Sequence, residues 1–246
     1  MIVQGLLLLI LAVNLVFGSF SHLKETLVLQ NLVILFGTYC IPFITINLLL
    51  PLIVKAGKTE SISQELNSLK AKDDVIKALL TKQPRIMVDK QSSQILFGNK
   101  NADILITILT NPHCNPCKKM HNKLLNYLMD ENCKFCIQYI FASFGEEFDI
   151  SSQFLIAAYM SNPLNVTLRI YKDWYTIGLY DRFSFFKKHN FPIDEKCINE
   201  YNQHNDWSLN SKLKATPTVL VNGYKIPKQY IVDDIRFLAT FDFSEL

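Results

Sequence analysis

The residues best able to do chemistry in this 246-residue chain lie in the segment 109–121, "LTNPHCNPCKKMH". Cys114 and Cys117 are separated by two residues, one of which is Pro116, and His113 comes directly before the first cysteine. Two thiols at this spacing can close a reversible disulfide, or they can supply half of a four-thiolate metal site. The elements that hold them decide between these two chemistries.

The metal alternative rests on a second pair, Cys133 and Cys136, which completes a C-x2-C-x15-C-x2-C pattern with a zinc-like spacing. We expect the first pair to lie between a buried strand and the start of a helix. The second pair lies at the opening of a strand, where an offset of three residues sends side chains to opposite faces. Such pairs converge poorly on one ion, so we expect no metal and keep a four-cysteine zinc module as an alternative.

The redox alternative has a physical reason for each part of the motif. Residues 94–110 read as a short strand, a turn and an apolar strand buried on both faces, and residues 118–130 have helical spacing. A helix N-terminus stabilises a thiolate through its unpaired amides and its dipole, and Cys114 is expected there, exposed. Cys117 follows one turn later, close enough to form the disulfide. Pro116 is harmless in the first turn of a helix.

The remaining elements place a second loop near this pair. Residues 134–144 predict a strand, 146–212 a long helical stretch, 218–227 a hairpin, and 232–241 a closing helix. Thr216 and Pro217, in "KATPTVLVNG", come just before the hairpin. A loop there would suit a position opposite the cysteines, where the Thr216 backbone could hydrogen-bond an extended substrate.

The front of the chain is apolar, and within residues 1–54 only Lys24 and Glu25 carry a formal charge. Its two apolar runs predict two membrane helices rather than a cleaved signal peptide, which would have a basic start. The stretch 55–85 predicts an amphipathic helical stalk that opens with a capping box at Ser61 and ends at Pro84. Residues 86–246 then form an α/β domain. The net charge of +3, without a basic cluster, argues against nucleic-acid binding.

Taken together, the strand, the CNPC motif, the helix and the late T-P-T loop resemble a thioredoxin-like fold of the DsbA-like kind. The resemblance puts Pro217 at the cis-proline of that fold and implies a helical insertion after Cys117. More narrowly, the chain is similar to the thioredoxin-like domain fused behind bacterial vitamin K epoxide reductase homologues. Those proteins carry a membrane CxxC beside a quinone, whereas the membrane part here has only Cys40. Quinone reduction therefore does not carry over, and residues 1–54 resemble a remnant anchor.

What the resemblance implies is a protein-disulfide oxidoreductase held in the bacterial inner membrane, with its thioredoxin-like domain outside the cytoplasm. Its substrates would be protein thiols and disulfides, and its electron partner a separate membrane or soluble protein. The redox-active disulfide Cys114–Cys117 would take the place of a bound cofactor, with Cys114 attacking and Cys117 resolving. Thr216, Pro217 and His113 are the expected substrate-binding residues.

Three questions stay open at this point. The uncharged residues within CNPC favour a reductant or isomerase over a strong oxidant. Lysines after the second apolar run favour a domain in the cytoplasm. The resemblance favours a domain outside the cytoplasm, and we follow the resemblance. A redox-inactive module that holds extended peptides is a further alternative. Of the other candidates, we expect His121 on an ordinary helix face and Cys197 in packing.

Overall fold

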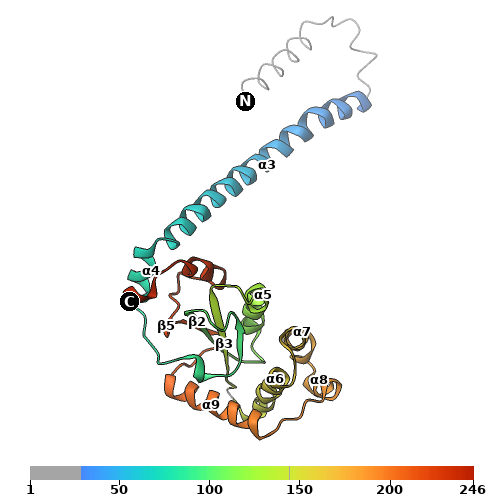
Figure 1. Ribbon diagram of the computed structural model, residues 1–246. Helices are drawn as coiled ribbons and strands as arrows, with labels where there is room; N and C mark the ends of the chain where they lie inside the picture. The colour runs from blue at the N-terminus through green and yellow to red at the C-terminus, as the bar shows by residue number, and fades with distance from the viewer. Residues whose placement is uncertain (1–28, 144) are drawn as a thin grey trace, which may run out of the picture. The chain divides into compact units, whose positions relative to one another are not determined.

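The computed structural model describes residues 29–143 and 145–246, and the chain divides into two compact units, 1–66 and 67–246. Figure 1 shows the helices and strands of both units. The predicted first membrane helix lies outside the described residues.

The described part of the first unit is one helix. Helix α3 (Leu29–Lys70) contains Pro42 and Pro51, and its last four residues belong to the second unit. From Phe36 onward it is long and apolar enough to cross a membrane, and it is the one such helix among the described residues. Ser61 lies inside α3, where its hydroxyl bonds to the Lys58 carbonyl oxygen at 2.9 Å, so the predicted capping box is wrong.

The amphipathic stretch 55–85 is split between the two units. Helix α4 (Asp73–Leu80) follows a break after Lys70, and its side chains Ile76 and Leu80 are buried in the core of the second unit. Lys70 also belongs there, because its ammonium group lies 2.8 Å from the Asp234 carboxylate. The predicted single stalk helix over 55–85 is therefore divided between the exposed end of α3 and the buried helix α4.

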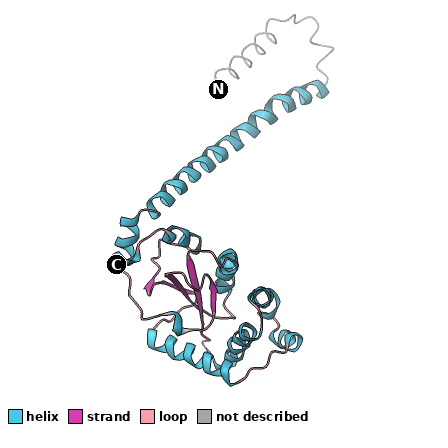
Figure 2. Ribbon diagram, in the orientation of Figure 1, coloured by secondary structure: helices cyan, strands magenta, loops and turns pink. Residues whose placement is uncertain are grey.

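The second unit is built on a five-stranded sheet with the order β1-β3-β2-β4-β5, drawn in magenta in Figure 2. The strands are β1 (Leu96–Gly98), β2 (Ile104–Thr110), β3 (Phe135–Phe141), β4 (Thr218–Val221) and β5 (Tyr224–Lys225). Strands β2 and β3 are parallel, and the other neighbours are antiparallel. This is the mixed sheet of a DsbA-like thioredoxin fold, as the resemblance implies.

Both faces of the central strands are buried, as the apolar sequence of β2 predicts. Ile106 and Ile108 point into the main core, whereas Leu105 and Leu109 alternate onto the other face and join two smaller clusters. Helix α5 (Asn115–Met129) follows β2 and packs onto the main core through residues such as Leu124. Because β2 and α5 both pack on the main core, the loop between them is held at both ends.

A helical insertion lies between β3 and β4, which confirms the predicted stretch 146–212. It contains η2 (Glu146–Phe148), α6 (Asp149–Ser161), α7 (Leu164–Asp173), the π-helical η3 (Trp174–Gly178), α8 (Arg182–His189) and α9 (Glu195–Ser211). Short 3-10 helices complete the unit at η1 (Lys90–Ser92), η4 (Val232–Ala239) and η5 (Phe243–Glu245). The predicted closing helix is therefore helical, with the tighter 3-10 winding.

The predicted hairpin turn is also present. Asn222 and Gly223 both have positive φ, 46° and 85°, which is the conformation that an Asn-Gly turn adopts most readily. A Cβ atom on Gly223 would lie 2.5 Å from the Ile86 carbonyl oxygen. The turn therefore needs glycine for space as well as for conformation.

Candidate active site

Cys114 occupies the N-cap of helix α5, at the end of the loop that follows β2. Its sulfur accepts a hydrogen bond from the Cys117 backbone N–H at 3.4 Å, and Pro116 lies in the first turn. Helix N-termini carry unpaired amides and the positive end of the dipole, which favour a negative charge on a capping group. Cys114 is half-buried, so a substrate can reach it.

The T-P-T loop lies directly beside this sulfur. The Cys114 thiol donates to the Thr216 carbonyl oxygen at 3.3 Å, and the Thr216–Pro217 peptide bond is cis, as the resemblance implies. The antiparallel pairing of β2 with β4 sets Leu109 opposite Thr218, so the two loops leave the same edge of the sheet. The structure therefore brings Cys114, Thr216 and Pro217 together.

Cys117 is the buried partner of the pair, with a side chain that is 1% exposed. Burial raises the pKa of Cys117 to about 12, and a hydrogen bond with the Cys114 thiol makes a smaller contribution to this rise. The Asn111 N–H, 3.5 Å from the sulfur, and the Thr110 side chain oppose this rise. Cys117 is thus a thiol at neutral pH, and the two cysteines are chemically different.

The ring of His113, which is expected to bind substrate, contacts the helical insertion. Its ring Nε2 lies 2.8 Å from the Ser151 hydroxyl of α6, and the ring packs against Phe148 with centroids 4.6 Å apart. Burial, with a smaller effect from Arg182, lowers the pKa of His113, so the imidazole is neutral at pH 7. The ring serves the contact with the helical insertion.

The loop before the cysteines is fixed to the insertion by a second contact. Trp174 is fully buried, and its indole N–H donates to the Pro112 carbonyl oxygen at 2.9 Å. The Asn111 side-chain oxygen accepts from the His113 backbone N–H at 2.8 Å. These bonds hold residues 111–113 in one conformation and so position Cys114.

The four-cysteine zinc alternative is wrong. Strands β2 and β3 are parallel, and Cys114 follows the end of β2 whereas Cys133 precedes the start of β3. The two pairs therefore lie at opposite edges of the sheet, about 20 Å apart for strands of this length. Cys133 and Cys136 also face different clusters, as the offset of three predicts. Within the described residues no group of three or more His, Cys, Asp or Glu side chains could hold a metal.

Buried polar side chains that are not among the predicted site residues lie behind Cys117. His121 is 1% exposed and bonds the Tyr139 hydroxyl through Nδ1 at 2.9 Å, so its assignment to an ordinary helix face is wrong. Burial lowers its pKa to about 3. The Thr110 hydroxyl lies 3.4 Å from that of Tyr175, which is also buried. The spacing of His121 indicates its burial, because it lies four residues after Cys117 and three before Leu124, on the buried face of α5.

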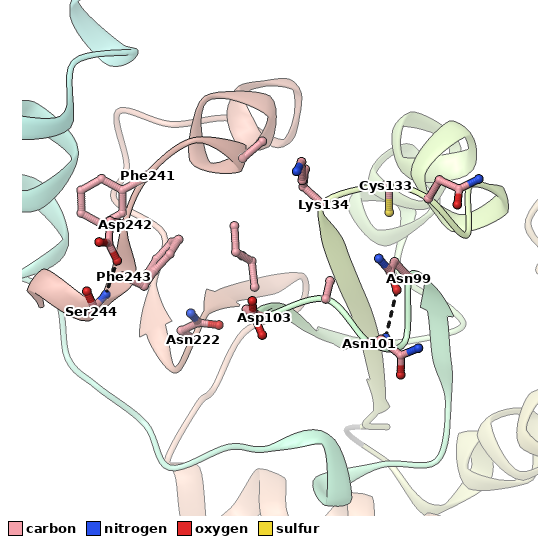
Figure 3. A pocket seen from close by; sticks show the side chains of 14 residues that line it. Asn99, Asn101, Asp103, Cys133, Lys134, Asn222, Phe241, Asp242, Phe243 and Ser244 are labelled. Carbon is pink, nitrogen blue, oxygen red and sulfur yellow. Dashed lines mark hydrogen bonds between the residues drawn. The ribbon is translucent and has the colours of Figure 1, made fainter.

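Two of the hollows that border this unit lie at opposite edges of the sheet. One, of about 470 Å³, begins beside the cysteines, where Pro116 and Pro217 line it. The other, of about 610 Å³, is lined by polar side chains such as Asn99 and Asp103 and by Cys133 (Figure 3). Only the first is next to Cys114.

No protein-family model matches the sequence, and no curated protein matches it. Among solved structures, a linker-deleted mutant of Proteus mirabilis ScsC superposes with a TM-score of 0.51 at 14% identity, covering 80% of this chain and 93% of that one. Oxidised BdbD from Bacillus subtilis gives a TM-score of 0.48 at 14% identity, covering 64% and 96%. DsbA from Chlamydia trachomatis gives 0.46 at 17% identity, covering 64% and 96%. At these identities the likeness concerns the fold.

Proposed function

We propose that this chain is a thiol–disulfide oxidoreductase that exchanges disulfides with protein thiols through Cys114 and Cys117. The observation that carries the proposal is the placement of the Cys114 sulfur, which lies at the start of α5 and 3.3 Å from the Thr216 carbonyl oxygen. A sulfur there meets both needs of the reaction. The helix start places backbone amides beside it, and the neighbouring backbone can hold an extended substrate.

The two cysteines divide the reaction between them. The Cys114 thiolate attacks one sulfur of a substrate disulfide, which forms a mixed disulfide and releases the other substrate sulfur as a thiolate. Cys117 then loses its proton to solvent and attacks the Cys114 sulfur, which releases the second substrate thiol. The substrate gains two electrons, and the Cys114–Cys117 pair loses them as it becomes a disulfide. The same steps in reverse would oxidise a dithiol substrate.

The setting of the reaction is part of the proposal. Helix α3 is apolar enough from Phe36 onward to anchor the chain in a membrane. We place the thioredoxin-like domain outside the cytoplasm, where disulfides persist. A separate redox protein would restore the pair after each cycle. CNPC brings no charged residue to the thiolate, so we assign a reducing or isomerising role, which a reduction potential as oxidising as that of DsbA would overturn.

The test is turnover of a peptide disulfide by the full chain in detergent. Wild-type protein should catalyse the exchange, and Cys114→Ser should reduce it to the uncatalysed rate. Cys197→Ala is the matched control, because Cys197 is buried against Met160 in the insertion, away from the reacting pair. Circular dichroism would show that each variant is folded. No turnover by folded wild-type protein would favour a redox-inactive binding module instead.

A further inference from the structure

The groove beside Cys114 has an apolar floor. Its walls come from the first turns of α5 and from the segment that begins at the T-P-T loop, and its volume is about 470 Å³. The apolar side chains include Met120, Val219, Ile226 and Ile231. Pro116 and Pro217 also line the groove, and they are the sequence neighbours of Cys117 and Thr216. A substrate held at Thr216 would continue into this groove.

The rim of the groove carries charge of one sign. Its lining residues include four lysines, Lys119, Lys123, Lys225 and Lys228, and no aspartate or glutamate. Lys123 pairs with Asp233. The other three are exposed, and in the described part of the chain their ammonium groups form no ion pair. Three lysines without an ion pair thus line an apolar groove that also reaches Pro116 and Pro217, the sequence neighbours of Cys117 and Thr216.

We propose that this groove selects acidic substrates, namely extended protein segments with carboxylates close to the reacting cysteine. The inference rests on the proposed function and names the class of substrate. Apolar side chains of the segment would cover the floor, and its Asp or Glu side chains would meet Lys119, Lys225 and Lys228. Opposite charges across an interface raise the rate of encounter and fix the register of the partner.

The size of the effect follows from the exposure of the lysines. An exposed ion pair contributes little by itself, so three of them together correspond to about a tenfold preference. Exposed pairs are also screened by salt. The preference should therefore be largest at low ionic strength and fall to about twofold near 0.5 M salt.

The experiment compares two peptide disulfides that differ only in charge, with Glu or with Gln on both sides of the cysteine. Full-length protein should turn over the Glu peptide with a kcat/KM about tenfold higher. Replacement of Lys119, Lys225 and Lys228 by Gln should remove the preference, so that this variant turns over the Glu and Gln peptides with equal kcat/KM. The matched control replaces Lys187, Lys188 and Lys196, exposed lysines of the insertion, and should keep the preference.

The outcomes separate the inference from the proposed function. Equal rates for the two peptides in wild-type protein would overturn the acidic preference and leave the exchange activity standing. If both triple variants lost the preference for the Glu peptide equally, the net charge of the protein would be its cause, and not the groove. If neither peptide is turned over, the proposed function fails. Binding of the same peptides with serine in place of cysteine then tests the groove, and equal affinities would overturn the inference.

Discussion

The Cys114 thiol and the Thr216 carbonyl oxygen lie 3.3 Å apart although they are 102 positions apart in the chain. The pairing of β2 with β4 produces this contact, because the CxxC loop follows one strand and the T-P-T loop precedes the other at the same edge of the sheet. A sulfur at this place has backbone hydrogen-bonding groups beside it and a helix start beneath it.

Two hydroxyl groups behind Cys117 should speed the resolving step. The Thr110 side chain lowers the pKa of Cys117 against the larger effect of burial, and the Tyr175 hydroxyl lies 3.4 Å from that of Thr110. Thr110→Val removes this support, so we expect the mixed disulfide to resolve about fivefold to tenfold more slowly. Rapid-quench kinetics would separate this step from the attack by Cys114, which should keep its rate.

Tyr175→Phe provides the graded control for this prediction. It leaves the Thr110 hydroxyl in place and removes only its neighbour, so the slowing should be smaller than in Thr110→Val. Equal slowing of both the attack and the resolving step in Thr110→Val would show a structural disturbance and contradict the assigned role.

The reduced protein should lose stability in alkali because of Cys117. Its pKa is about 12 in the folded state, above the ordinary thiol value, so the unfolded chain gives up the proton first. This contribution to stability is complete below about pH 8.5 and is lost as the pH rises towards 12, by up to ~1.4 kcal/mol per pH unit. Denaturant unfolding in a reducing agent at pH 8, 9 and 10 measures this effect. The free energy of unfolding should fall with pH in wild-type protein and fall less in Cys117→Ala. A constant difference between the two proteins would contradict it.

His121 should make the fold sensitive to acid. Its pKa is about 3 when folded, below the ordinary imidazole value, so the unfolded chain takes up the proton first. The stability it contributes is complete above about pH 6.5 and is lost as the pH falls towards 3. His121→Leu should be less stable than wild-type protein at pH 7, where the bond to Tyr139 is lost, and the gap should narrow at pH 5. An equal difference in stability between the two proteins at pH 7 and pH 5 would contradict the prediction.

The proposed orientation predicts how Cys114 labels in cells. A membrane-impermeant maleimide, applied to intact cells with any outer membrane permeabilised, should modify reduced Cys114 because the side chain is half-buried and outside the cytoplasm. A Cys114→Ser strain controls for the other thiols. Labelling that requires a broken inner membrane would place the domain in the cytoplasm.

The sequence was sufficient for the elements that carry the site. The apolar run of β2 and the helical spacing after Cys117 placed Cys114 at a helix start, and the Asn222-Gly223 turn placed the last hairpin. The proximity of Thr216 to Cys114 could be expected only through the resemblance, since nothing local in the sequence specifies which strands pair.

Other features depend on tertiary contacts that a local pattern does not contain. The stretch 55–85 has the pattern of one amphipathic helix, yet Ile62 is exposed and Ile76 is buried. His113 lies directly before Cys114, but its ring turns to Ser151 because the insertion packs against that loop. His121 is polar, yet its spacing matches the buried stripe of α5 and its side chain is 1% exposed.

In the proposed reaction Cys114 forms the mixed disulfide and Cys117 releases it, so removal of Cys117 should trap the intermediate on Cys114. Full-length Cys117→Ala, mixed with a peptide disulfide and quenched with acid, should carry one peptide, which peptide mapping by mass spectrometry places on Cys114. Wild-type protein treated in the same way should instead contain the Cys114–Cys117 disulfide and no peptide. Absence of any adduct on folded Cys117→Ala, or adducts spread over the other cysteines, would show that Cys114 is not the attacking cysteine.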